Sequence, residues 1–207
     1  MTGDPDGVDE DKRATLRRFA ALGAAGPLAR FADEDAVDGA DSSDARDAIA
    51  GYLSTTPGAH FSKIRDDLSL GTGETQHHLR RLVEAGAVES FRDGEYRRYV
   101  PADRFGPFEK RALGYLRRST PRGMVVALLR DPTASGSDLA DALSVSRPTV
   151  SKYAKELEEA GLLSRSDGYT LERPEALLTL LVRYAHSFGP AAAAVADDAD
   201  SLIRYDP

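Results

Sequence analysis

A repeat at an offset of 75 residues constrains the fold of this chain more than any other feature. Residues 76–86 read QHHLRRLVEAG and residues 151–161 read SKYAKELEEAG, and each is followed by a β-like run with an Asp-Gly turn. The matching positions are Ile64 and Leu139, Leu68 and Leu143, Leu70 and Val145, Thr75 and Val150, Leu82 and Leu157, and Gly86 and Gly161. A unit repeated in register predicts two copies of one small domain.

The first copy shows three helical patterns and a hairpin pattern. A helix of roughly ten residues is expected from Ser43 or Asp44 to the Pro57-Gly58 stop. A second helix is expected over residues 60–68, and a third over 73–86, where Gly86 suits a left-handed cap. Residues 87–100 predict a hairpin around an Arg-Asp-Gly-Glu turn. Three helices and a hairpin make a winged helix-turn-helix.

The second copy repeats this order over residues 121–132, 135–143, 144–161 and 162–171. We therefore predict a mainly α fold with small β-hairpin wings (α+β): two winged helix-turn-helix domains in tandem plus N- and C-terminal helices. The expected divisions are an acidic, partly disordered segment with one amphipathic helix (1–43), a first domain (44–103), a linker helix (104–120), a second domain (121–173) and C-terminal helices (174–207).

The formal net charge of −7 is distributed unevenly along the chain. Residues 1–59 carry 6 basic and 12 acidic side chains, residues 60–130 carry 14 and 9, and residues 131–207 carry 7 and 13. A positive middle lies between two acidic ends, so the net charge does not exclude an anionic partner. Asp outnumbers Glu 22 to 12 and Arg outnumbers Lys 22 to 5, a composition that resembles haloarchaeal proteins.

An amphipathic helix over about residues 12–32 is predicted between two acidic stretches whose composition favours disorder. Its apolar residues expected to face the protein are Leu16, Phe19, Ala20 and Leu22. The alternative for Arg17 and Arg18 before an apolar run is a twin-arginine export signal. Export signals place their bulky apolar residue one position later than Phe19, and Pro27 interrupts the run. We therefore expect a cytoplasmic protein that keeps this helix.

Two segments of the sequence resemble a known family of regulators. LSVSRPTVSKYAKELEEAGLLSRSDGYTL resembles the winged helix-turn-helix region of bacterial and archaeal transcription regulators of the MarR, ArsR and TrmB kind, and GETQHHLRRLVEAGAVESFRDGEYRRYV resembles the same motif. The tandem arrangement is similar to that of a haloarchaeal regulator with two such domains. The resemblance covers residues 44–172 and implies sequence-specific binding of double-stranded DNA. One departure is Gly71 and Gly73 in the first turn, where the family more often has Ser, Arg or Pro.

In such proteins the recognition helix places N-terminal residues against base edges, while Lys and Arg elsewhere hold phosphates. Gln76 suits adenine, Glu74 suits cytosine and Arg147 suits guanine. The candidate DNA-binding residues are Thr72, Glu74, Gln76, His77, Arg80, Arg81, Arg92, Arg97 and Arg98 in the first copy, and Ser146, Arg147, Thr149, Ser151 and Lys152 in the second. For each of them, the alternative is an ordinary solvated helix face or wing. Charge favours the first copy as the main contact.

Two further helices are predicted outside the repeats. Residues 107–118 carry Lys110, Arg111, Arg117 and Arg118 beside an apolar face, so they form either a packed linker helix or a continued phosphate-contacting surface. Residues 174–189 begin with Pro and are apolar over more than one face, which requires two packing partners. Those partners are either both domains of the same chain or a second copy of the helix in a homodimer, which we favour.

Other function classes find little support in the sequence. The chain has no cysteine, and its adjacent pair His77 and His78 points in different directions on a helix, so no metal site is predicted. No phosphate loop, nucleophile elbow or acid–base pair suggests an enzyme, and neither a cofactor nor a membrane-spanning segment is expected. The remaining alternative is a winged-helix adaptor that binds proteins of the transcription machinery. An effector, if one acts, is expected to be an apolar small molecule or a partner protein.

Overall fold

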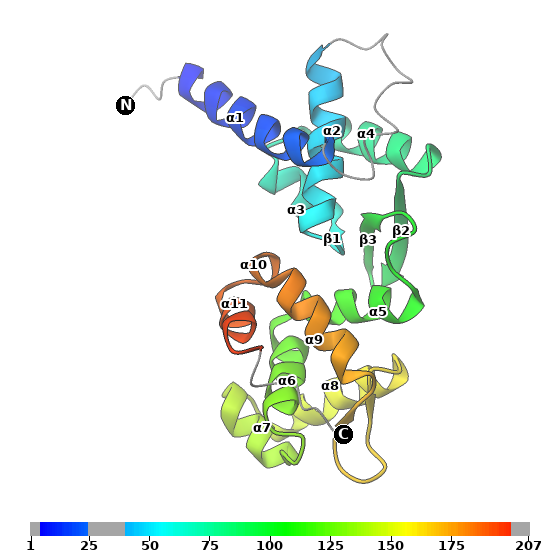
Figure 1. Ribbon diagram of the computed structural model, residues 1–207, viewed down its shortest axis with the longest axis vertical. Coiled ribbons are helices and arrows are strands. Elements are labelled where there is room, and N and C mark those ends of the chain that lie inside the picture. Colours follow the sequence, from blue (N-terminus) through cyan, green and yellow to red (C-terminus); the bar gives the residue numbers. More distant parts are fainter. Residues whose placement is uncertain (1–4, 25–39, 200–207) are drawn as a thin grey trace. The chain divides into compact units, whose positions relative to one another are not determined.

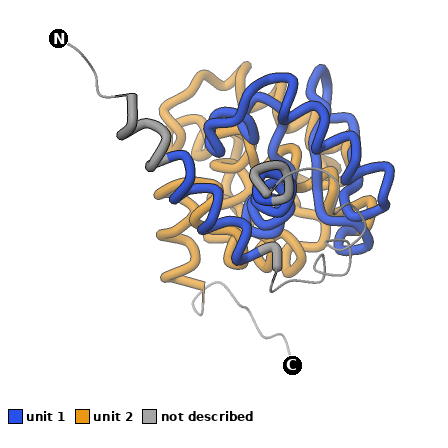
Figure 2. The backbone as a smooth tube through the Cα atoms, turned by 90° about the horizontal axis from the view of Figure 1, so that it is seen from above, with its two compact units in different colours: residues 1–105 blue, residues 106–207 orange. Residues whose placement is uncertain are grey.

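The computed structural model of the chain describes the backbone of residues 5–24 and 40–199, and the side chains within those ranges except at 5–11, 23–24, 40–43 and 191. The chain divides into two compact units, Met1–Phe105 (unit 1) and Gly106–Pro207 (unit 2), which Figure 2 distinguishes by colour. Among the described residues, no helix is long and apolar enough to cross a membrane.

Unit 1 contains four helices and a small antiparallel sheet within its described residues (Figure 1). The elements are α1 (Pro5–Ala24), α2 (Ala40–Thr55), β1 (Ala59–His60), α3 (Phe61–Asp67), α4 (Thr72–Glu84), β2 (Val88–Asp93) and β3 (Tyr96–Pro101). The strand order is β1-β3-β2, and β2 and β3 form the wing hairpin.

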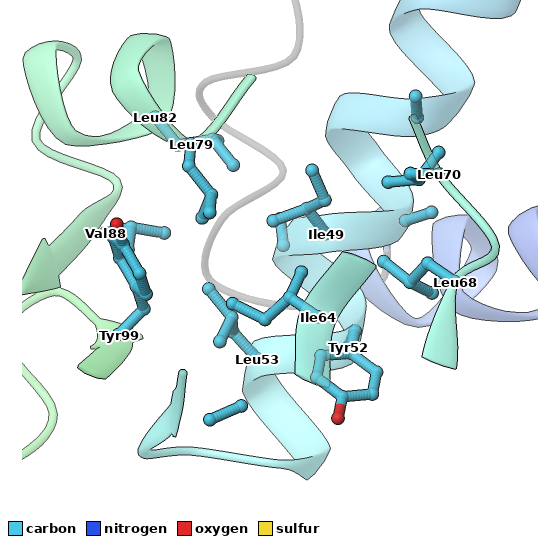
Figure 3. Packing of buried hydrophobic residues seen from close by; sticks show 14 of the residues in the cluster. Ile49, Tyr52, Leu53, Ile64, Leu68, Leu70, Leu79, Leu82, Val88 and Tyr99 are labelled. Carbon is cyan, nitrogen blue, oxygen red and sulfur yellow. The ribbon is translucent and has the colours of Figure 1, made fainter. Parts of the chain in front are cut away.

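One apolar core joins the helices of unit 1 to its sheet (Figure 3). Its largest contributions are Ile49, Tyr52 and Leu53 from α2, Ile64 and Leu68 from α3, Leu79 and Leu82 from α4, and Val88 and Tyr99 from the sheet. α1 joins this core through Leu16, and the ring of Phe19 meets that of Tyr52 edge to face at 5.4 Å. Since a fully buried aliphatic or aromatic side chain stabilises a fold by about 1.5–3 kcal/mol, this core holds α4 and the wing in place.

Unit 2 repeats this arrangement and adds helices before and after it. Its elements are α5 (Pro107–Leu116), α6 (Ser119–Arg130), α7 (Gly136–Leu143), α8 (Arg147–Glu159), β4 (Leu163–Ser164), β5 (Thr170–Leu171), α9 (Pro174–Arg183), α10 (Ala185–Phe188) and α11 (Pro190–Asp197). α9 packs against α5, α6, α10 and α11, so the two packing partners that its broad apolar surface requires lie within its own unit.

The repeat seen in the sequence is a repeat of structure. α4 and α8 each have 13 residues and begin 75 positions apart, at Thr72 and Arg147. Gly86 and Gly161 follow these helices with positive φ angles of 69° and 67°, a conformation that glycine adopts without strain. Ser69 and Ser144 share a left-handed conformation in the turns before α4 and α8. The expected fold class, mainly α with small β wings and two helix-turn-helix units in tandem, is confirmed.

Several boundaries differ from those expected. α1 begins at Pro5 rather than near residue 12, and α2 begins at Ala40 rather than at Ser43 or Asp44. A proline at the first helical position loses no hydrogen bond, because the first N–H groups of a helix have no partner in it. The prediction that Leu22 faces the protein is wrong, since its side chain is 43% exposed. The predicted helical residues 25–32 lie outside the described residues.

The two wings differ more than expected. The ladder of the first wing has six residue pairs, from Val88 with Pro101 to Asp93 with Tyr96, and β1 adds a third strand beside β3. The ladder of the second wing has only two pairs. The second wing is rich in Ser, Asp and Gly, which have low strand propensity, and this composition explains its short ladder.

Candidate nucleic-acid interface

The recognition helix of unit 1, α4, is held by one face and exposes the other. Thr75, Leu79 and Leu82 recur at helical spacing and are buried, and the Thr75 hydroxyl donates to the Gly71 carbonyl at 2.8 Å. Thr72, Gln76 and Arg80 are exposed on the remaining surface. α4 therefore presents a polar face that begins at its N-terminus, as a helix that reads a groove requires.

Glu74 has a structural role that the sequence analysis missed. Its carboxylate accepts a hydrogen bond from the Gly71 N–H at 3.0 Å, which closes the N-terminal turn of α4. The same oxygen lies 3.7 Å from Nζ of Lys12 in α1. The predicted cytosine acceptor is therefore already engaged within the chain. In a capping box, a Glu three residues after the N-cap residue accepts a hydrogen bond from the backbone N–H of that residue. Glu74 stands three residues after Gly71, so the sequence already contained this signal.

The other candidates on α4 have weak or partial contacts. Arg80 lies 3.8 Å from the Glu84 carboxylate, and both side chains are about two-thirds exposed, so the ion pair contributes little. The ring of His77, which is half-buried, meets that of the buried His78 edge to face at 5.2 Å. Arg81 is half-buried on the same helix. Thr72, Gln76 and Arg80 are thus the exposed candidates of α4, whereas His77 and Arg81 are half-buried.

The first wing carries two arginines directly opposite each other. Arg92 of β2 pairs in register with Arg97 of β3, so both side chains leave the same face of the sheet. Both are exposed, and among the described residues no carboxylate pairs with either. Arg97 donates from Nε to the Ser90 hydroxyl at 3.0 Å. Like charges opposite each other destabilise a ladder, so an anion bound between them would relieve a built-in repulsion.

Arg98, the third arginine of the wing among the candidate DNA contacts, is not part of this exposed pair. It is 3% exposed, because consecutive strand residues point to opposite faces and Arg98 faces away from Arg97. Its Nε donates to the Asp93 carboxylate at 2.5 Å and its Nη1 to the Gly58 carbonyl at 2.9 Å. The Tyr96 ring lies 5.4 Å from its guanidinium. Arg98 thus links the wing to the turn between α2 and β1.

Three of the candidates at the start of α8 in unit 2, Ser146, Arg147 and Thr149, are engaged within the unit. Ser146 caps α8 by accepting from the Thr149 N–H at 3.3 Å, and the two hydroxyls are 2.8 Å apart. Arg147 donates to the Ser137 hydroxyl at 2.7 Å. Lys152 lies 3.9 Å from the Glu156 carboxylate, and Ser151 is exposed. Unit 2 therefore offers fewer unengaged groups at its recognition helix than unit 1.

The arginines of the second wing and of the α5 region also have partners. In the second wing Arg165 donates from Nε to Glu158 at 2.7 Å, and this hydrogen bond lowers the pKa of the Glu158 carboxyl. On and after α5, Arg111 donates to the Ala160 carbonyl at 2.7 Å and Arg117 to the Ser187 carbonyl at 2.6 Å. Arg118 lies 3.5 Å from Glu156. These contacts identify residues 107–118 as a packed helix of unit 2.

Unit 2 also has a groove of about 640 Å³ between α6, β5 and α9. Leu128, Leu129, Leu171, Leu178 and Val182 supply most of its apolar lining, and Tyr169, Thr179 and Arg183 add polar groups. Among the described residues, no three His, Asp or Glu side chains are grouped to hold a metal ion.

Two helix-turn-helix units in tandem, each with a third helix and a wing, are the arrangement that DNA-binding helix-turn-helix domains have. Comparison with known families agrees: residues 43–113 match a family described as an N-terminal HTH domain, and residues 111–180 match the Crp-like helix-turn-helix domain. No curated protein and no solved structure matches the chain. The matches support DNA binding in general, while the closer resemblance to MarR, ArsR or TrmB regulators stays a prediction.

Proposed function

We propose that the protein is a sequence-specific DNA-binding transcriptional regulator whose main DNA contact is unit 1. α4 enters the major groove, where Gln76 reads a base and Thr72, His77, Arg80 and Arg81 contact bases or phosphates near it. Arg92 and Arg97 of the wing hold phosphates or enter a narrow minor groove.

The observation that carries this proposal is the exposed pair Arg92 and Arg97. A ladder that keeps two like charges opposite each other, with neither of them paired to a carboxylate of the described residues, gives up stability locally. Guanidinium groups bind phosphate through planar, bidentate hydrogen bonds, so the pair suits a nucleic-acid backbone. In the second wing the arginine is paired with Glu158 instead, which favours unit 1 as the contact.

Unit 2 has a supporting role in this proposal. Ser146, Thr149 and Arg147 hold the start of α8 in place, and Ser151 and Lys152 are the candidates there that remain for phosphate contact. Arg98 and Glu74 are excluded from the proposed DNA contacts, because one is buried in the wing and the other closes the first turn of α4.

Three further properties are part of the proposal. The protein acts in the cytoplasm, where its DNA target lies, and its acidic composition suits a haloarchaeal cell. It binds as a homodimer, which would match the two-fold symmetry of operator DNA. The packing of α9 within its own unit does not require a dimer, and sedimentation equilibrium of the full chain tests the assembly state.

The proposal is tested by titrating DNA across a series of salt concentrations, on a site found by genome-wide crosslinking. R92A/R97A should weaken binding and lower the salt slope by about 0.9 for each phosphate that is no longer neutralised. Q76A should keep the slope and cost about 1–3 kcal/mol at one base pair, provided its amide makes a bidentate contact. The matched control R130A/R165A removes two exposed arginines of unit 2 that are paired with carboxylates, and should bind as the wild type does.

An R92A/R97A variant that binds with the affinity and slope of the wild type would remove the wing from the interface. If the wild-type protein binds neither the crosslinked site nor random duplexes, the adaptor function becomes the better account of the fold.

A further inference from the structure

α1 has an arginine-rich surface that the proposed function does not use. Arg13, Arg17 and Arg18 are all exposed, and among the described residues no carboxylate pairs with any of them. Within that part of the chain, Arg18 lies 6.0 Å from the ring of the neighbouring Phe19. Residues 1–59 as a whole are acidic, with 12 acidic and 6 basic side chains, so three exposed arginines close together on one helix stand out.

The opposite side of α1 fixes the helix to unit 1. Leu16 is buried in the core, and the Phe19 ring packs edge to face on Tyr52 of α2 at 5.4 Å. One turn before Leu16, Lys12 reaches Glu74 at 3.7 Å. Glu74 belongs to the first turn of α4, so α1 is held beside the N-terminus of the recognition helix.

The spacing of the arginines suits a nucleic-acid backbone. Arg13 and Arg17 are four residues apart, so they lie on one face of α1, separated by about 6 Å along its axis. Each directly follows a residue that contacts the rest of unit 1, Lys12 or Leu16, so the two arginines lie beside the packed side of α1. Arg18 extends the positive surface to the outer side of the helix.

We propose that α1 is a second DNA-contacting element, in which Arg13, Arg17 and Arg18 bind phosphates beside the groove that α4 reads. The inference rests on the proposed function, because it assumes that the N-terminus of α4 meets DNA. α1 contributes affinity without sequence information, since phosphate contacts position a protein but do not read bases. The contact of Lys12 with Glu74 fixes the position of α1, and therefore of its phosphate contacts, relative to the recognition helix α4.

Charge and apolar exposure favour DNA over an anionic membrane surface. A helix that lies on a bilayer needs an apolar face to insert. Among the described side chains of α1, Leu16 and Phe19 face the core of unit 1, and Leu22 is the large apolar side chain that is exposed. One exposed leucine does not make such a face.

The test compares R13A/R17A/R18A with the matched control R130A/R165A/R183A, which removes three exposed arginines from unit 2. Each is titrated with the crosslinked site and with a random-sequence duplex across salt concentrations. The α1 variant should weaken binding to both duplexes by the same factor, and its salt slope should fall by about 0.9 for each phosphate that it no longer neutralises. The control should retain wild-type slopes. Helix content and thermal unfolding verify that each variant folds, and R13K/R17K/R18K should restore most of the slope.

Three outcomes would overturn the inference. Wild-type affinity and slope in the α1 variant would show that α1 does not touch DNA, and tighter binding would show that α1 shields the DNA surface. The third outcome concerns vesicles of phosphatidylglycerol and phosphatidylcholine. If the wild-type protein binds these vesicles, the α1 variant does not, and DNA binding is unchanged, α1 is a membrane-binding helix. In each of these cases the wild-type protein still binds DNA, whereas failure of the proposed function is seen as no wild-type DNA binding at all.

Discussion

At the scale of single residues, three arginines of one wing have two roles. Arg92 and Arg97 point from one face of the hairpin into solvent, while Arg98 points from the other face and is enclosed by Asp93, Tyr96 and the Gly58 carbonyl. The difference arises because side chains alternate between faces along a strand, so neighbours in sequence meet different surroundings.

R98A should therefore destabilise unit 1 by about 3–5 kcal/mol, because it breaks the buried ion pair of Arg98 with Asp93. R97A removes an exposed side chain and should change stability by less than about 0.5 kcal/mol. Urea unfolding of the two variants and the wild type, followed by far-UV circular dichroism, measures both effects. Equal stability of R98A and R97A would mean that the buried ion pair does not support the wing.

At the scale of elements, α4 combines an exposed reading face with a buried face that contains a histidine. His78 is 5% exposed, and burial lowers the pKa of its imidazole below the ordinary 6.5, with the neighbouring His77 adding to the shift. The fold thus favours the neutral ring. The stability that this provides is complete above pH 6.5 and is lost as the pH falls from 6.5 towards the folded-state pKa, because the unfolded chain binds the proton first.

H78L should remove this part of the pH dependence while it keeps an apolar group against the core. The exposed His186 of α10 provides the control H186Q, which should leave the pH profile unchanged. Amide hydrogen exchange of α4 between about pH 7.5 and 5, a window that spans the ordinary histidine pKa, measures the stability once it is corrected for the intrinsic rates. A wild-type profile that stays flat over this window would contradict the prediction.

At the scale of the whole molecule, each unit buries its own set of apolar side chains around its recognition helix. Leu82 of α4 and Leu157 of α8 are equivalent positions of the repeat, and both are buried. L82A and L157A should each lower the protection of the slowest-exchanging amides in their own unit by about 2–5 kcal/mol, because each removes buried apolar surface and leaves a cavity. Each variant is the matched control of the other. If either mutation lowers protection equally in both units, the units unfold as one body instead of separately.

The sequence alone determined the features of this protein that depend on local pattern. Helical spacing and the 75-residue offset predicted two winged helix-turn-helix units, and they identified α4 and α8 as the recognition helices. Gly86 was predicted as a helix cap because glycine adopts its left-handed conformation without strain. These features follow from propensity and periodicity, which act within a few residues.

The tertiary structure decided which charged side chains are available to a partner. Arg98 is enclosed because the fold brings the Gly58 carbonyl, 40 residues earlier, beside it. The Glu74 carboxylate, which already accepts from the nearby Gly71 N–H, meets Lys12 as well because α1 packs at the start of α4. Arg117 is held by Ser187, 70 residues later. A charged side chain is exposed or paired according to what the fold places next to it. Spacing in the sequence indicates the face of an element, but it does not identify the residues that pack against that face.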